Sequence, residues 1–124
     1  MNSTSTCSTT QASVRRNGNG VTVQVPGAVR LVVAGEGTQR ANVERLAEAS
    51  GVSDRVTFLG AVGDEALLEL YSGALAVIYS PFDEDYGYVT LESFLSHKPV
   101  ITTTDAGGPL EFVEHETSGF ICEP

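Results

Sequence analysis

From residue 21 to the end of the chain, short apolar runs alternate with segments of helical period, and this alternation limits the fold more than any other feature. Strand and helix in regular succession predict parallel strands with helices on both faces of the sheet, an α/β fold. In such sheets, ligands bind beyond the carboxyl ends of the strands. We expect strands at 21–25, 29–34, 55–59, 75–79, 99–103 and 119–122, and helices at 38–50, 64–74, 88–97 and 107–113.

The first two expected helices have recognisable starts and faces. Thr38 and Asp64 carry side-chain oxygens that can accept hydrogen bonds from the free N–H groups of a first turn, so we expect both to be N-caps. Helical spacing places the apolar side chains of each helix on one buried face. These side chains are Val43, Leu46 and Ala47 in the first helix and Leu67, Leu70, Tyr71 and Ala74 in the second.

Length, charge and cysteine content narrow the class of protein. The 124 residues suffice for one domain, and they contain no apolar run of 18 residues that would predict a membrane span. The formal net charge of −9 argues against nucleic acid or anionic lipid as a partner, because both need a basic surface. Cys7 and Cys122 make no disulfide framework, and the N-terminus lacks a signal-peptide layout. We therefore expect a cytoplasmic protein, either free or held at the cytoplasmic face of a membrane by a longer parent protein.

The N-terminal segment differs in composition from the rest of the chain. Residues 1–20 are rich in Ser, Thr, Asn and Gly and hold almost no large apolar side chain. A segment of this kind cannot bury enough apolar surface to fold alone. We therefore expect a disordered tail at 1–20 and a folded domain at 21–124.

The stretch from Glu84 to Glu92, with Gly87 between the two glutamates, is the main candidate for a binding site. It joins an expected strand to an expected helix, so one carboxylate lies in a loop and the other on the helix. Carboxylates accept hydrogen bonds from sugar hydroxyls, and a helix start offers free N–H groups to a phosphate. Glycine at the junction has no Cβ, which allows the backbone to approach a ligand closely. This layout suits a sugar attached to a phosphate.

Several motifs in order carry a resemblance to a known family. Together they resemble the donor-binding domain of family 4 retaining glycosyltransferases, over about residues 29–124. The resemblance implies a Rossmann-like, mostly parallel sheet that forms a truncated C-terminal domain of the GT-B fold. The motifs are Leu31-Val-Val-Ala-Gly-Glu-Gly37, Asp54-Arg-Val-Thr-Phe-Leu-Gly60, Glu84 to Glu92, Lys98-Pro-Val100, Gly107-Gly-Pro-Leu-Glu111 and Ser118-Gly-Phe-Ile-Cys-Glu-Pro124; the last two also resemble mannosyltransferases of lipid-linked oligosaccharide assembly.

The same resemblance assigns roles to residues. It implies a UDP- or GDP-sugar as donor substrate, transfer with retention of configuration, and no cofactor or essential metal. Glu84, the expected catalytic residue, would contact hydroxyls of the transferred sugar, and Glu92 would hold the ribose. The remaining expected donor-binding residues are Tyr86, Gly87, Tyr88 and Val89, whose backbone would approach the sugar and diphosphate, and Val62, whose backbone would meet the base.

Three adjacent acidic residues, Asp83, Glu84 and Asp85, raise the question of a metal site. Adjacent residues in a loop cannot all point one way, so we expect no metal there. The sequence also departs from the family pattern, because no strand ending in Gly-Arg with a following lysine precedes residue 29. The acceptor-binding domain is also missing from the 124 residues. We therefore expect a fragment whose parent is an enzyme and which transfers little sugar alone.

The strand that the family pattern lacks here would lie in the middle of the sheet. We expect residues 21–25 to fold back through Pro26-Gly27 and pair antiparallel with 29–34, since so short a connection cannot make a parallel crossover.

Three other functions can be compared with the composition and motifs of the chain. A non-catalytic module that binds a nucleotide or a partner protein fits the same composition and stays open. A phospho-acceptor receiver domain needs an acidic pair after its first strand, and the first 35 residues contain no acidic residue. A dinucleotide-dependent oxidoreductase needs a full glycine fingerprint, which Gly35 and Gly37 do not complete.

Overall fold

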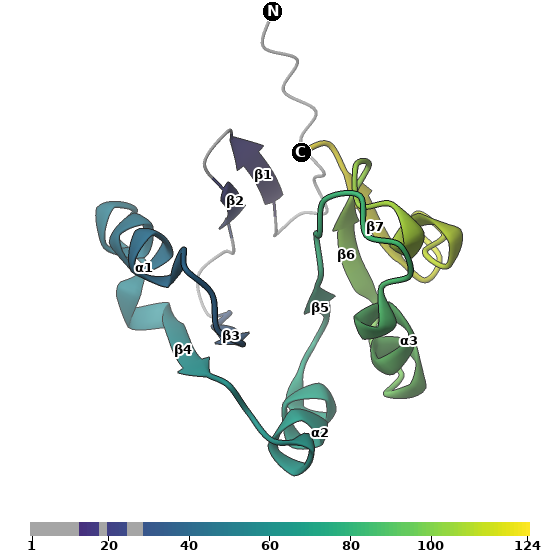
Figure 1. The fold of residues 1–124 in the computed structure, drawn as a ribbon, viewed down its shortest axis with the longest axis horizontal. Helices are drawn as coiled ribbons and strands as arrows, with labels where there is room; N and C mark the ends of the chain where they lie inside the picture. The colour runs from purple at the N-terminus through teal and green to yellow at the C-terminus, as the bar shows by residue number, and fades with distance from the viewer. Residues whose placement is uncertain (1–12, 18–19, 25–28) are drawn as a thin grey trace, which may run out of the picture.

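The computed structural model describes residues 13–17, 20–24 and 29–124 of the chain (Figure 1). Strands and helices alternate along it as the sequence predicts. In chain order the elements are β1 (Ser13–Asn17), β2 (Gly20–Gln24), β3 (Leu31–Ala34), α1 (Arg40–Ala49), the 3-10 helix η1 (Ser53–Arg55), β4 (Val56–Gly60), α2 (Asp64–Gly73), β5 (Val77–Ile78), α3 (Tyr88–Leu95), β6 (Val100–Thr103), the 3-10 helix η2 (Gly108–Glu111) and β7 (Gly119–Cys122).

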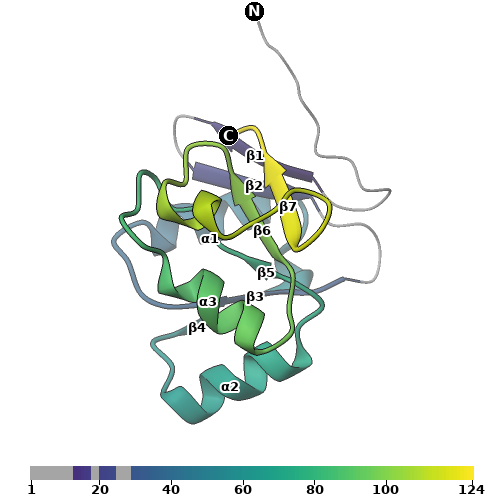
Figure 2. The ribbon, with the colours of Figure 1, turned by 90° about the vertical axis from the view of Figure 1, so that its right-hand side faces the viewer.

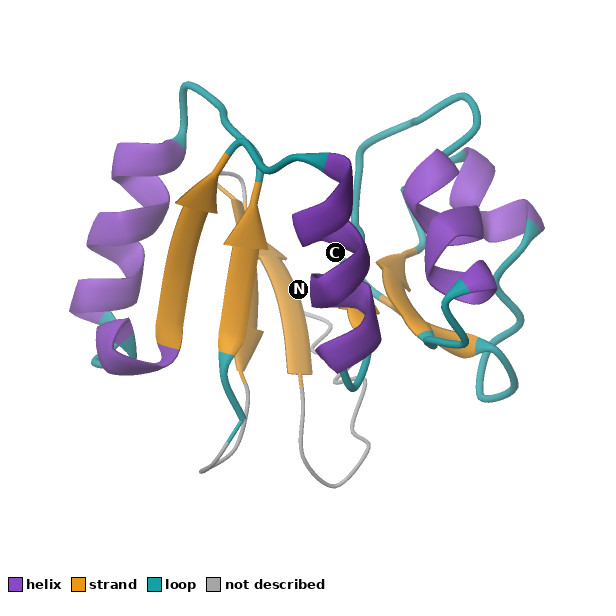
Figure 3. Ribbon diagram, turned by 90° about the horizontal axis from the view of Figure 1, so that it is seen from below, coloured by secondary structure: helices purple, strands orange, loops and turns teal. Residues whose placement is uncertain are grey.

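The strands from residue 31 onward are parallel, which confirms the predicted α/β class. They do not form one continuous sheet, however. β3 pairs with β4 in a two-stranded sheet, and β5, β6 and β7 form a separate sheet in that order. Figures 1 and 3 show α1 beside the first sheet and α3 beside the second, with α2 linking the two halves.

Two expectations for the N-terminal residues are wrong: the pairing partner of the strand at 21–25, and the absence of structure throughout 1–20. β2 pairs antiparallel with β1, in a register that sets Val23 opposite Val14, and not with β3. Part of the expected disordered tail, Ser13–Asn17, is therefore a strand, while residues 1–12 and Val25 lie outside the described residues. The register joins Asn17 to Gly20 across a two-residue connection, so pairing within the hairpin closes a much shorter loop than pairing with distant chain. The two residues between them in the sequence, Gly18 and Asn19, are of types that are common in short hairpin connections.

The predicted N-caps are both displaced by one residue. α1 begins after Gln39 and α2 after Gly63, and neither of these residues caps its helix through a side chain. Thr38 thus lies outside α1, whereas Asp64 lies in the first turn of α2. A carboxylate in a first turn still interacts favourably with the helix dipole without acting as the cap.

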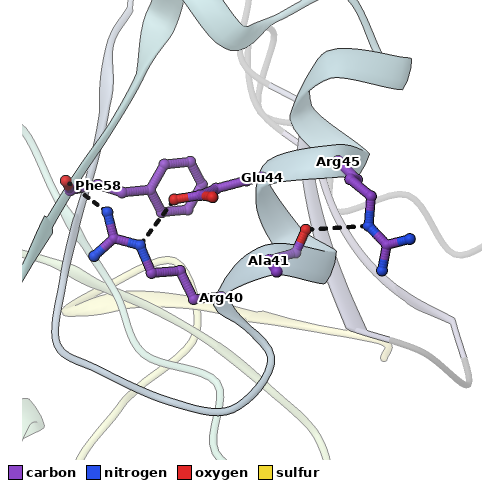
Figure 4. A network of polar contacts seen from close by, with 5 residues as sticks. All are labelled: Arg40, Ala41, Glu44, Arg45 and Phe58. Atoms are coloured by element: carbon purple, nitrogen blue, oxygen red, sulfur yellow. Dashed lines mark hydrogen bonds and ion pairs between the residues drawn. The ribbon is translucent and has the colours of Figure 1, made fainter.

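Side chains of α1 hold that helix against β4 (Figure 4). The Arg40 guanidinium donates to the Glu44 carboxylate at 2.8 Å and to the Phe58 carbonyl oxygen at 3.5 Å. It also lies 5.9 Å from the centre of the Phe58 ring, which is a cation–π contact. On this helix only Ala47 is buried; Val43, which was expected on the buried face, is 39% exposed.

The packed core of the described residues lies mainly around β6 and β7. These two strands run side by side in Figure 2. Val100 and Ala106 have no exposed surface, and Val113 and Cys122 are also buried. On the expected buried face of the second helix, Tyr71 is buried. Leu67, Leu70 and Ala74 are half-buried. The loops that follow β5 and β6 leave this core at the same edge of the sheet.

Candidate functional site

The loop between β5 and α3 lies against the loop that follows β6. Backbone hydrogen bonds join them: Asp83 N–H donates to Asp105 O at 2.9 Å, and Glu84 N–H donates to Ala106 O at 3.0 Å. In return, Gly108 N–H donates to Glu84 O at 2.6 Å. Glu84 therefore has a fixed backbone even though its side chain is exposed. The carboxyl ends of β5 and β6 meet here, where parallel sheets bind their ligands.

The glycine pair after β6 makes this close contact possible. A Cβ on Gly107 would lie 2.6 Å from Glu84 O, and a Cβ on Gly108 would lie 2.6 Å from Asp85 O. Both approaches are far inside van der Waals contact, so any larger residue would push the loops apart. The pair is required by backbone packing, whether or not a ligand also touches it.

Gly87 is the N-cap of α3 and takes a left-handed conformation, with φ 74° and ψ 58°. Residues other than glycine rarely adopt these angles. A Cβ on Gly87 would also lie 2.7 Å from Pro109 Cγ and 3.2 Å from Tyr79 Cε1. The space that the missing Cβ leaves is thus occupied by protein side chains, and packing accounts for the glycine that the sequence associated with a close ligand approach.

The start of α3 supplies backbone donors. The N–H of Thr90 is used by Gly87 O at 2.9 Å. The N–H groups of Tyr88 and Val89 precede it in the first turn, where a helix offers no carbonyl acceptor of its own. These two N–H groups lie at the positive end of the helix dipole. They fit the expected role of binding a negatively charged group.

The Glu84 carboxylate is associated with Tyr79, the residue that follows β5. Burial raises the pKa of the Tyr79 hydroxyl, and the negative charge of Glu84 and a hydrogen bond to it add to the effect. The ring of Tyr79 packs under Gly87. One side chain thus connects the loop carboxylate to the start of the helix.

The second carboxylate, Glu92, is held by Tyr71 from α2. The Tyr71 hydroxyl donates to Glu92 Oε2 at 2.8 Å. Tyr71 is 7% exposed, and burial, together with the hydrogen bond to Glu92 and its charge, raises the pKa of the hydroxyl to about 12. The sequence placed Tyr71 only on a buried helical face. No local pattern relates residues that are 21 positions apart, so the pair could not have been found from spacing.

Aromatic side chains gather beside the loop. The Tyr86 and Tyr88 rings lie 5.0 Å apart between centroids, and Tyr86 lies 5.7 Å from Phe112. Tyr86 is 49% exposed and Tyr88 is 69% exposed. Both rings are therefore accessible next to the free N–H groups of α3, although Tyr86 is also a packing partner of Phe112.

Val62 lies on a different loop, between β4 and α2, and is half-buried. The other six predicted site residues are brought together between the end of β5 and the middle of α3. At the edge of the β3–β4 sheet, Gly35 N–H donates to Gly60 O at 2.7 Å, which joins the ends of those two strands. Beside them is an open depression of about 500 Å³, lined by Glu36, Gly37, Thr38 and Arg40.

Comparison with known proteins identifies the family of the chain. Residues 24–124 match the family described as "Glycosyl transferases group 1". The human alpha-1,3/1,6-mannosyltransferase ALG2 is 36% identical over 104 residues, which cover 77% of this chain and 25% of ALG2. Among the described residues, no helix is both long and apolar enough to cross a bilayer.

Solved structures show the same fold. HepE of Anabaena, solved in complex with UDP and glucose, superposes with a TM-score of 0.67 at 31% identity, over 80% of this chain and 28% of HepE. WaaG, a glycosyltransferase involved in lipopolysaccharide biosynthesis, gives a TM-score of 0.63 at 29% identity, over 74% of this chain and 24% of WaaG. The chain thus spans about a quarter of the length of these relatives. It belongs to the group 1 glycosyl transferases, with the family 4-like α/β architecture of the GT-B fold.

Proposed function

We propose that residues 29–124 bind a nucleotide-sugar donor for a transfer that retains the configuration of the sugar. Glu84 accepts hydrogen bonds from hydroxyls of the transferred sugar, and Glu92 accepts them from the ribose. The N–H groups of Tyr88 and Val89 bind the diphosphate. Val62 presents its backbone to the base.

The observation that carries this proposal is the order of groups around the start of α3. An exposed carboxylate at Glu84 precedes the left-handed Gly87, and a second carboxylate at Glu92 follows one turn into the helix. Between the two carboxylates in the chain lie the first-turn N–H groups of Tyr88 and Val89, which have no carbonyl acceptor within their own helix. A nucleotide sugar has the matching order of sugar hydroxyls, diphosphate and ribose hydroxyls. The presence of UDP and glucose in HepE supports this ligand class.

Charge limits what this chain does with the donor. The net charge of −9 opposes a diphosphate, so local groups must compensate for it. Within 29–124, Arg40 is paired with Glu44, and Lys98 Nζ donates to Ser72 O at 3.0 Å. Each of these cations is thus engaged away from the start of α3. We therefore expect weak donor binding by the 124-residue chain and little transfer, since a departing diphosphate needs electrostatic stabilisation.

Titration with UDP-glucose and GDP-mannose tests the proposal. We expect chemical-shift changes at the amides of Tyr88, Val89 and Glu92, and the nucleotide that binds more tightly identifies the base. Glu92→Gln should weaken binding about tenfold, because it replaces one acceptor oxygen of a hydrogen-bonded carboxylate with a donor.

Glu48→Gln is the matched control, since Glu48 is an exposed glutamate on α1, away from the start of α3. It should leave the affinity unchanged. The proposal is overturned if neither donor shifts these amides at millimolar concentration, or if the two variants weaken binding equally.

A further inference from the structure

Tyr71 and Glu92 form a hydrogen bond between α2 and α3. The proposed function gives a role to Glu92 but none to Tyr71. The hydroxyl of Tyr71 lies 2.8 Å from Glu92 Oε2, although the two residues are 21 positions apart in the chain. The tyrosine is 7% exposed, whereas Glu92 is exposed. A buried tyrosine therefore holds Oε2 of a glutamate that is itself exposed.

The direction of this hydrogen bond is determined by chemistry. An ionised carboxylate accepts hydrogen bonds and cannot donate them. The raised pKa of Tyr71 keeps its proton in place at neutral pH, so the tyrosine is the donor. The carboxylate has about four lone-pair sites, and Tyr71 occupies one of them on Oε2. The bond from Tyr71 therefore leaves acceptor capacity on the carboxylate for hydroxyl donors of a ligand.

A second contact docks the same end of α2. Lys98 Nζ, just beyond α3, donates to the Ser72 carbonyl oxygen at 3.0 Å. Ser72 is the neighbour of Tyr71, so the Lys98 contact can hold α2 in place without the tyrosine hydroxyl. The two contacts therefore allow a structural role to be separated from an effect on Glu92.

We propose that Tyr71 is a positioning residue that fixes the Glu92 carboxylate for the ribose hydroxyls and thereby sets the preference for ribonucleotide donors. The inference rests on the proposed function. Without the tyrosine hydroxyl, Glu92 rotates about its side-chain bonds and must be ordered when the donor binds. A site built to accept from hydroxyls discriminates strongly against an analogue that lacks them. Loosening the acceptor should reduce that discrimination.

The test compares Tyr71→Phe with the unmodified 124-residue chain. The dissociation constant is measured for whichever of UDP-glucose and GDP-mannose binds, and for its 2′,3′-dideoxyribose analogue. Tyr71→Phe should weaken the ribose donor about fivefold to tenfold and change the affinity for the dideoxy analogue less than twofold. An equal loss for the two ligands, or no loss for either, would overturn the inference.

Two control variants separate the alternatives. Tyr79→Phe removes the hydroxyl associated with Glu84, so any effect on affinity should be the same for the ribose and dideoxy ligands. Lys98→Met removes the other contact between α2 and the segment after α3, and it should lower thermal stability without a ribose-dependent effect on affinity. A ribose-dependent loss in Lys98→Met as large as that in Tyr71→Phe would show that only helix docking matters.

A variant that keeps the ring and the hydroxyl covers the case in which Tyr71→Phe does not fold. Tyr71→3-fluorotyrosine makes the hydroxyl a stronger donor, so the preference for the ribose donor over the dideoxy analogue should change from that of the unmodified chain. An unchanged preference would count against the inference. If the unmodified chain binds neither UDP-glucose nor GDP-mannose, the proposed function and this inference both fall; if it binds and only the ribose dependence is missing, the inference falls alone.

Discussion

The two parallel sheets of this chain differ in how completely their strands are covered. Val32 in β3 and Leu59 in β4 are each 45% exposed, although both strands are apolar. In β6, by contrast, Val100, Thr102 and Thr103 are buried, and β7 is buried at both ends. A parallel strand is stable when both faces and both edges are covered. The central strand of a three-stranded sheet meets this condition better than either strand of a pair.

This difference explains where the candidate site lies. Glu84 is hydrogen-bonded to the loop after β6, and Gly87 packs against Pro109 in η2, directly after that loop. Both residues are therefore held by the better packed half. Val62 and the depression near Arg40 belong to the half with little buried surface. Precise binding groups belong on rigid elements, and weakly packed segments open more readily. We expect the sugar and diphosphate contacts to be better ordered than the base contact.

The largest difference between the halves should come from adding a methyl group at a glycine. A Cβ on Gly119 in β7 would meet the Val100 carbonyl oxygen directly, whereas a Cβ on Gly37 has no atom within 4 Å. Gly119→Ala should therefore lower the free energy of unfolding by about 3 kcal/mol, and Gly37→Ala should change it by less than about 0.5 kcal/mol. Urea unfolding followed by circular dichroism measures both. Equal effects would show that the two halves are packed alike.

Truncation of a valine should have a smaller effect with the same asymmetry. Val100 has no exposed surface, and Val32 is 45% exposed. Val100→Ala should cost about 2 kcal/mol through lost burial and the cavity that remains, while Val32→Ala should cost less than about 0.5 kcal/mol. The same unfolding experiment gives the two values. A cost at Val32 as large as that at Val100 would mean that β3 is covered in solution by something that binds it.

The smallest effect concerns α2, which lies between the halves. The folded chain raises the pKa of Tyr71 from 10.0 to about 12, so it keeps the tyrosine proton at a pH where the unfolded chain has lost it. The stability that Tyr71 contributes is present in full below pH 10 and is lost as the pH rises through 12. We expect a loss of about 1 kcal/mol, below the roughly 2.7 kcal/mol that a shift of two pKa units gives in full, because Glu92 is exposed and solvent screens its charge.

Tyr71→Phe provides the reference for that measurement. The variant should be less stable at neutral pH and should lack the corresponding part of the alkaline loss, as followed by unfolding at several values between pH 9 and pH 12. If both proteins lose the same stability with pH, the hydroxyl does not hold α2 to the C-terminal half.

The α/β class and most elements were predictable, because they depend on local patterns. The apolar run at Pro99 to Thr103 became β6, and the segment from Tyr88 became α3, each within a few residues. Prediction failed where two segments, β1 and β3, could each pair with the same strand, β2. β2 was expected beside β3 but pairs with β1, since the local hairpin closes the shorter loop. The helix starts near Thr38 and Asp64 were each off by one residue, which reflects the weak specification of helix ends.

The sequence by itself determined the alternation of strands and helices, the two glutamates that flank Gly87 in the chain, and the membership of a glycosyl transferase family. Tertiary structure alone decided that the sheet divides in two, that Pro109 and Tyr79 fill the space beside Gly87, and that Tyr71 holds Glu92. The physical reason is the distance along the chain over which each interaction acts. Periodicity and turn chemistry act over a few residues, whereas packing and long-range hydrogen bonds depend on which distant segments come together when the chain folds.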